Sequence, residues 1–133
     1  MKVPAEFKHE LEESYPSTTK FFVTSRDGQI VEIYPMEEWL KYEEKLDAAP
    51  MSEDAVQILL ENLNYYGQVV DMDGQGRLLM PQLLRESAKL QGEVAVIGNL
   101  RRLLVRNMAE YTAHIQENRL TNDHKKILSE YKL

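Results

Sequence analysis

A tight, glycine-spaced acidic turn between two apolar runs is the feature that most constrains the fold of this chain. A strand pattern runs into the segment Asp73-Gly74-Gln75-Gly76, and Arg77 and a short apolar run closed by proline follow it. Two strands joined this closely need residues that tolerate positive φ, and we expect Gly74 and Gly76 to supply them. Arg77 is therefore predicted at the edge of a sharp turn, with its guanidinium directed outward.

Calcium binding is one interpretation of this turn. Asp71, Asp73 and Gln75 alternate as oxygen ligands, and Gly76 falls where an EF-hand loop turns. The same register, however, places Gln82 where a bidentate carboxylate should close the site. The residues before the loop also indicate a strand rather than the entering helix of an EF-hand. We therefore expect no metal site and no cofactor.

A structural hairpin turn is the second interpretation, in which Asp73 caps its own backbone and Arg77 is a solvated charge. Composition taken alone favours it. Catalysis has little support, because no histidine, cysteine or lysine lies near Asp71 and Asp73 in sequence as a partner. We expect neither an enzyme nor a small-molecule substrate.

The segment from Asp73 to Pro81 resembles the D-x-x-G-R-[apolar]-x-[apolar]-P signature of the MraZ family, within the AbrB-like swapped-hairpin DNA-binding proteins. Residues 33–39, Ile-Tyr-Pro-Met-Glu-Glu-Trp, resemble the Y-P-[apolar]-E-E-W segment of that family. Residues 83–86 and 92–94 resemble the helix and strand after the signature. The resemblance covers nearly all of the chain except its C-terminal tail, and in this order and spacing the motifs are specific.

The resemblance implies an α+β protein, built as a swapped-hairpin or double-split β-barrel of two pseudo-repeats with flanking helices. We divide the chain into a first repeat at 1–50, a linking helix at 51–64, a second repeat at 65–118 and a C-terminal helical tail at 119–133.

Hairpin patterns in both halves support this repeat. Asp27-Gly28 separates two β-rich runs in the first half, and Gly98-Asn99 does so in the second. A helix is predicted after each hairpin, at 36–48 and at 108–117.

Four further helical segments are predicted. An apolar residue and proline open a short helix in each half, at Val3-Pro4 and at Met80-Pro81. Ser52 is expected to cap the linking helix. The tail from residue 121 is predicted to be helical, with an apolar stripe that docks on a core or on a neighbouring subunit.

The first half lacks the strand and the D-x-x-G-R loop that family members carry before the first proline motif. Because such a barrel interleaves strands from both halves, we expect an unpaired edge and a gap in the core. Our hypothesis is that Met1 is not the natural start of the protein.

The resemblance implies a bacterial transcriptional regulator that binds repeated sites in the promoter of its own division and cell-wall gene cluster, as a closed ring of subunits. Arg77 is the first candidate for contact with double-stranded DNA, because a forked guanidinium can bind a guanine edge or a phosphate. Gln75 and Arg85 are further candidates. The residues expected to shape the loop are Asp73, Gly74 and Gly76.

Other conspicuous side chains are assigned structural roles. Trp39 has helical spacing with Tyr42 and Leu46, which predicts core or a subunit contact. Arg101 and Arg102 fall at a predicted hairpin turn and are expected to be solvated.

The charge distribution permits DNA binding without requiring it. The net charge is −6, but residues 1–66 hold 6 Lys/Arg against 14 Asp/Glu, a net of −8. Residues 67–133 hold 10 against 8, a net of +2. An acidic half can face away from DNA or meet a basic half of another subunit.

Two function classes therefore remain open. One is the DNA-binding regulator, expected to be cytoplasmic and nucleoid-associated, with no membrane partner. The other is a swapped-hairpin oligomerisation or antitoxin-like interaction module that does not bind DNA.

Overall fold

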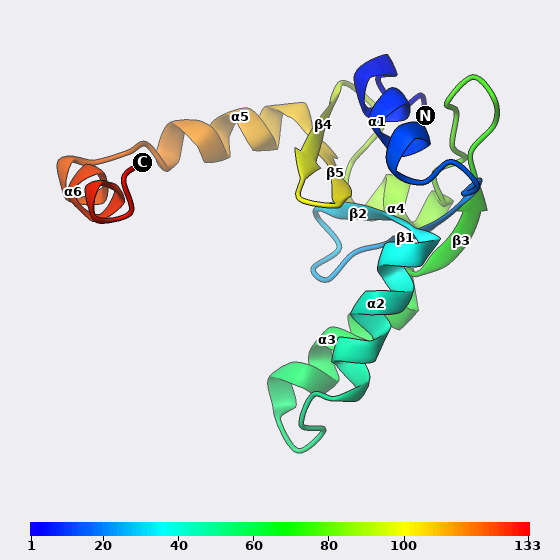
Figure 1. Ribbon diagram of the computed structural model, residues 1–133, viewed down its shortest axis with the longest axis horizontal. Coiled ribbons are helices and arrows are strands. Elements are labelled where there is room, and N and C mark those ends of the chain that lie inside the picture. The colour runs from blue at the N-terminus through cyan, green and yellow to red at the C-terminus, as the bar shows by residue number, and fades with distance from the viewer.

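The computed structural model describes all residues 1–133 and belongs to the expected α+β class. In chain order its elements are α1 (Ala5–Ser14), β1 (Lys20–Thr24), β2 (Val31–Pro35), α2 (Met36–Asp47), α3 (Asp54–Tyr66), β3 (Gln68–Asp71), α4 (Gln82–Ser87), β4 (Val94–Asn99), β5 (Arg102–Asn107), α5 (Met108–Glu117) and α6 (Asn122–Glu130). Figure 1 shows α2 and α3 projecting from one side of the sheet and α5 leading away to α6. No helix combines the length and the hydropathy that crossing a membrane requires.

The five strands form one antiparallel sheet in the order β3-β1-β2-β5-β4. The β1–β2 hairpin of the first half therefore lies between β3 and β5 of the second half, so one sheet contains strands from both halves. The sheet is not closed into the β-barrel that the resemblance implies, because no hydrogen bonds join the edge strands β3 and β4. The five strands have four to six residues each, and β3 and β4 are the two open edges.

The main core lies on one face of this sheet, since side chains alternate between faces along a strand. Phe21 and Val23 of β1 and Ile33 of β2 contribute to a cluster of twelve buried residues. Leu84 of α4 joins it, and Phe7 of α1 packs against it. These contacts hold α1 and α4 to the sheet.

A smaller core on the opposite face holds α2 and α3. Trp39 is buried, as predicted, and its ring stacks on that of Phe22 with centroids 4.1 Å apart. Tyr34 packs edge-on against the same indole, and Leu63 of α3 completes the cluster. The aromatic residues thus serve packing.

The second hairpin turns later than predicted. Asn99 pairs with Arg102, so the turn is Leu100-Arg101 rather than Gly98-Asn99. Leu100 has a φ of 58° and takes the left-handed position that a glycine would occupy at lower cost. Gly98 serves packing instead, because a Cβ at this position would lie 3.0 Å from the ring of Phe7.

The start of α3 differs from the prediction, whereas the tail helix α6 agrees with it. Ser52 does not cap α3, which begins after Glu53 without a side-chain cap. The tail is helical as predicted, and Thr121 caps α6 by accepting a hydrogen bond from the backbone N–H of His124. The apolar stripe of α6 does not dock on the core of its own chain, since Tyr131 remains 71% exposed.

Candidate nucleic-acid interface

The turn after β3 is closed by hydrogen bonds centred on Asp73. The Gly76 N–H donates to the Asp73 carbonyl oxygen, and the Asp73 N–H donates to the Arg77 carbonyl oxygen, each at 3.0 Å. The Asp73 carboxylate oxygen Oδ1 also accepts from the backbone N–H groups of Gln75 (2.8 Å) and Arg77 (3.0 Å). These donors, led by the Arg77 N–H, hold the pKa of Asp73 below its ordinary value. An ionised Asp73 therefore organises the loop.

Only one of the two glycines in the loop has the predicted backbone conformation. Gly76 has a φ of +78°, and a Cβ there would lie 2.8 Å from the Lys8 Cδ. Gly74 is not among the residues with positive φ, and open space surrounds it. The expectation that both glycines supply positive φ is wrong for Gly74, because a single left-handed residue closes this turn.

Arg77 presents a partly free guanidinium to solvent. Its Nε donates to Asp73 Oδ2 at 2.8 Å, and the side chain is 60% exposed. Both carboxylate oxygens of Asp73 are thus engaged, one by the backbone and one by the side chain of Arg77. The two Nη atoms have no hydrogen-bond partner within the protein. This edge can bind two acceptor atoms at once, as in bidentate recognition of guanine or phosphate.

The N-terminal residues fix the backbone beside Arg77. The Leu78 N–H donates to the Met1 carbonyl oxygen at 2.7 Å, and the Val3 N–H donates to the Gly76 carbonyl oxygen at 2.8 Å. Val3 is fully buried. The segment that carries Arg77 is therefore bonded on the Asp73 side and on the N-terminal side.

Lys2 is a candidate that sequence reasoning missed. It lies opposite Arg77 in an antiparallel bridge, a position in which two side chains project from the same face and can contact a common ligand. Lys2 is exposed and forms no ion pair. The one sequence signal for it is its place directly before Val3-Pro4, the counterpart of Met80-Pro81.

Gln75 lies in the same loop as Arg77, whereas Arg85 lies on α4. Gln75 is exposed in the loop, and its side chain has no hydrogen-bond partner. Arg85 is exposed on α4 and forms no ion pair. Arg77 and Arg85 line separate hollows that share Leu79, which is 76% exposed. The two arginines therefore flank an apolar side chain rather than meet in one pocket.

The geometry does not favour the calcium interpretation. β3 enters the loop as a strand, as the residues before the loop predicted. Asp73 already accepts hydrogen bonds on both carboxylate oxygens. Its lone pairs are directed at N–H donors rather than toward a common centre.

A second charged cluster corrects the prediction for Arg102. The Glu32 side chain is only 3% exposed, and it accepts bonds from Arg26 Nε (2.9 Å) and Nη2 (2.8 Å), from the Tyr34 hydroxyl (2.8 Å) and from Arg102 Nη1. Arg102 is paired rather than solvated, because the register of β2 and β5 places it beside Tyr34. Burial first, and then the charge of Glu32, raise the pKa of Tyr34 to about 12.

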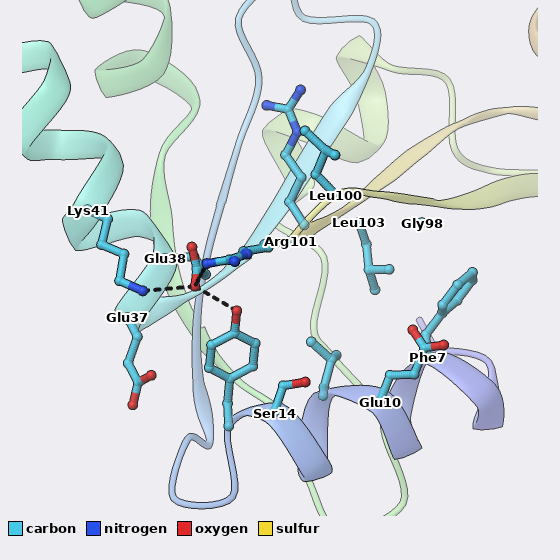
Figure 2. A pocket seen from close by; sticks show the side chains of 13 residues that line it. Phe7, Glu10, Ser14, Glu37, Glu38, Lys41, Gly98, Leu100, Arg101 and Leu103 are labelled. Carbon is cyan, nitrogen blue, oxygen red and sulfur yellow. Dashed lines mark hydrogen bonds and ion pairs between the residues drawn. The ribbon is translucent and has the colours of Figure 1, made fainter. Parts of the chain in front are cut away.

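A cavity of about 440 Å³ lies between α1, the start of α2 and the β4–β5 hairpin (Figure 2). Glu38 in its wall accepts hydrogen bonds from the Tyr15 hydroxyl (2.7 Å) and from Lys41 Nζ (3.3 Å). Burial alone would raise the pKa of Glu38, but these two donors outweigh it and lower the pKa. Glu10, Glu37 and Glu38 in its lining are balanced by Lys41, Arg101 and Arg102, so the lining carries no net charge. The hydrogen bond between Tyr15 and Glu38 connects the end of α1 to α2.

Comparison with known proteins gives one family model and several curated relatives, all named MraZ. Residues 67–128 match the family model described as "MraZ protein, putative antitoxin-like". A curated protein of Acidobacterium capsulatum named "Transcriptional regulator MraZ" is 44% identical over 133 residues, which cover 100% of this chain and 90% of that protein. Its namesake in Koribacter versatilis is 48% identical over 130 residues, 98% of this chain and 88% of that protein. A third, from Carboxydothermus hydrogenoformans, is 34% identical over 72% of this chain and 63% of its own length.

Proposed function

Because this chain belongs to the MraZ family of transcriptional regulators, we propose that it is a sequence-specific DNA-binding regulator. It acts at the promoter of a bacterial division and cell-wall gene cluster, in association with the nucleoid. The observation that carries this proposal is the exposed Arg77 guanidinium, which Asp73 holds through Nε while both Nη atoms have no partner in the chain.

Arg77 supplies the specific contact in this proposal. A guanidinium fixed at a rigid turn can place its two Nη atoms on the O6 and N7 acceptors of a guanine in the major groove. Gln75, in the same loop, is positioned as a second polar contact. Lys2 and Arg85 contribute phosphate contacts, which orient the loop without reading the sequence.

Repeated sites and an oligomeric ring compensate for the weakness of one loop. The chain carries a net charge of −6, so its overall field opposes approach to DNA. Copies tethered in a ring convert each further contact into an intramolecular event, which multiplies weak affinities. In this arrangement the two interleaved halves of the sheet are pseudo-repeats, and only the second carries a D-x-x-G-R loop.

Fluorescence anisotropy tests the proposal. The full chain is titrated into duplex DNA from its own upstream promoter and into a scrambled duplex, at several salt concentrations. We expect selective binding that weakens with salt. Arg77→Ala should weaken promoter binding at least about fivefold, because one bidentate base contact contributes about 1–3 kcal/mol of discrimination.

Arg119→Ala is the matched control, because it removes the same charge from an exposed position between α5 and α6. It should leave promoter affinity within about twofold of the unmodified chain. Circular dichroism and size-exclusion chromatography follow folding and assembly of both variants. Equal weakening by both variants, or unfolding of Arg77→Ala, would contradict the assignment of Arg77 to DNA.

A second candidate function is a protein-interaction module of the antitoxin type. Two observations favour it: residues 67–128 match a family described as antitoxin-like, and the apolar residues Ile127, on α6, and Tyr131, directly after it, are exposed. Absence of selective DNA binding by the unmodified chain, at every salt concentration, would favour this candidate over the first.

A further inference from the structure

A second cavity, of about 570 Å³, lies between the β1–β2 turn, α2 and the β4–β5 turn. Its volume is within the range of small-molecule sites. Half of its ten lining residues are cationic, namely Arg26, Lys41, Lys45, Arg101 and Arg102. One carboxylate, Glu38, lines it as well.

Two of these cations are held close together by a shared partner. Arg26 Nη2 and Arg102 Nη1 both donate to the same oxygen, Oε1 of the buried Glu32. Two guanidinium groups that share one acceptor oxygen lie within a few ångströms of each other and repel. Arg26 Nη1 and Arg102 Nη2 have no hydrogen-bond partner, so each group retains free donors.

The charges around this cavity are not balanced within the chain. Glu32 and Glu38 supply two negative charges against the five cations of the lining, which leaves a net of +3. Lys45 forms no ion pair, and Arg101 approaches Glu38 only at 3.8 Å. Residues of the first half contribute +1 of this excess and residues of the second half contribute +2, although the first half as a whole has a net charge of −8. A bound anion would relieve the repulsion.

We propose that this cavity binds a small anion that carries a phosphate or diphosphate group. Tetrahedral phosphate oxygens can accept from two guanidinium groups and an ammonium at once, which a single planar carboxylate cannot do as fully. The stacked rings of Tyr34 and Tyr42, 5.9 Å apart, form an apolar wall beside the cations. They can contact the organic part of such a ligand.

The site is separate from the Arg77 loop. No residue lines both this cavity and the hollows beside Arg77 and Arg85. Figure 1 shows the loop between β3 and α4 well apart from the β1–β2 turn. A phosphate bound here is therefore that of a free small molecule rather than of DNA held by Arg77.

Isothermal titration calorimetry of the full chain with sodium pyrophosphate at low ionic strength tests the proposal. We expect saturable binding. Lys45→Glu should weaken it at least about tenfold, because it replaces an unpaired cation of the wall by an anion. Arg101→Ala is a second variant that weakens binding by removing another exposed cation, and circular dichroism confirms that both fold.

Lys125→Glu is the matched control, with the same charge change on the exposed surface of α6. It should retain pyrophosphate binding, and so should Arg77→Ala. Absence of saturable binding, or equal weakening by Lys125→Glu, would overturn the proposal. Loss of pyrophosphate binding in Arg77→Ala would also overturn the proposal, because it would assign the phosphate to the Arg77 loop. Failure of the chain to bind promoter DNA, by contrast, would leave the proposal intact.

Discussion

Both carboxylate oxygens of Asp73 are hydrogen-bonded to Arg77: Oδ1 accepts from its backbone N–H at 3.0 Å, and Oδ2 accepts from its Nε at 2.8 Å. One acidic side chain thereby fixes both the backbone and the guanidinium direction of one arginine. The carboxylate next to the proposed DNA contact is thus a positioning group, although its charge opposes DNA.

Asp73→Ala should weaken promoter binding, even though it removes a negative charge from the loop proposed to contact DNA. The loss of preorganisation should cost about 1 kcal/mol, or about fivefold in affinity. Asp71→Ala is the control, since it removes an equal charge from an exposed side chain that only pairs with Lys20 at 3.2 Å. Anisotropy titrations compare the two. Tighter binding by Asp73→Ala would show that its charge outweighs its hydrogen bonds.

Gly76→Ala should destabilise the protein, whereas Gly74→Ala should not. Gly76 has a φ of +78°, and an alanine there costs about 1–2 kcal/mol of unfolding free energy. Gly74 has open space and no positive φ, so its substitution should change that free energy by less than about 0.5 kcal/mol. Urea denaturation measures both values. Equal destabilisation would refute the different roles of the two glycines.

Glu32→Gln should lower the free energy of unfolding by about 3 kcal/mol, because it leaves the half-buried Arg26 and Arg102 without their shared carboxylate. Glu37→Gln, at an exposed position of α2, serves as the control and should change stability by less than about 0.5 kcal/mol. Urea denaturation at neutral pH provides the comparison. A value for Glu32→Gln as small as that for Glu37→Gln would mean that the network contributes little.

Stability should decline in alkaline solution as Tyr34 ionises. Burial first, and then Glu32, raise the pKa of its hydroxyl from 10.0 to about 12, so folding favours the neutral form. Its contribution is complete below pH 10 and is lost as the pH rises through about 12. Tyrosinate absorbance measures the ionisation, and urea denaturation measures the free energy of unfolding, across this pH range. Tyr34→Phe should reduce the fall in unfolding free energy with pH, whereas Tyr65→Phe, at an exposed position, should not. Equal pH dependence in the two variants would exclude ionisation of Tyr34 as its cause.

Much of the secondary structure was predictable because it depends on neighbours along the chain. Pro4 and Pro81 mark helix starts, Asp27-Gly28 marks the first hairpin, and the helical spacing of Trp39 indicates its burial. The Asp73-to-Arg77 turn was predictable for the same reason, since its hydrogen bonds join residues at most four positions apart.

The remaining features depend on residues that are far apart in sequence. Lys2 reaches Arg77, and Glu32 reaches Arg102, only through strand pairings that no local pattern specifies. The turn at Leu100 and the open edges of the sheet follow from the same pairings, which packing against Phe7 and the other core residues selects. Periodicity and turn chemistry thus established the elements and the arginine loop. The tertiary structure decided which charges meet, because long-range register follows from the free energy of the whole core.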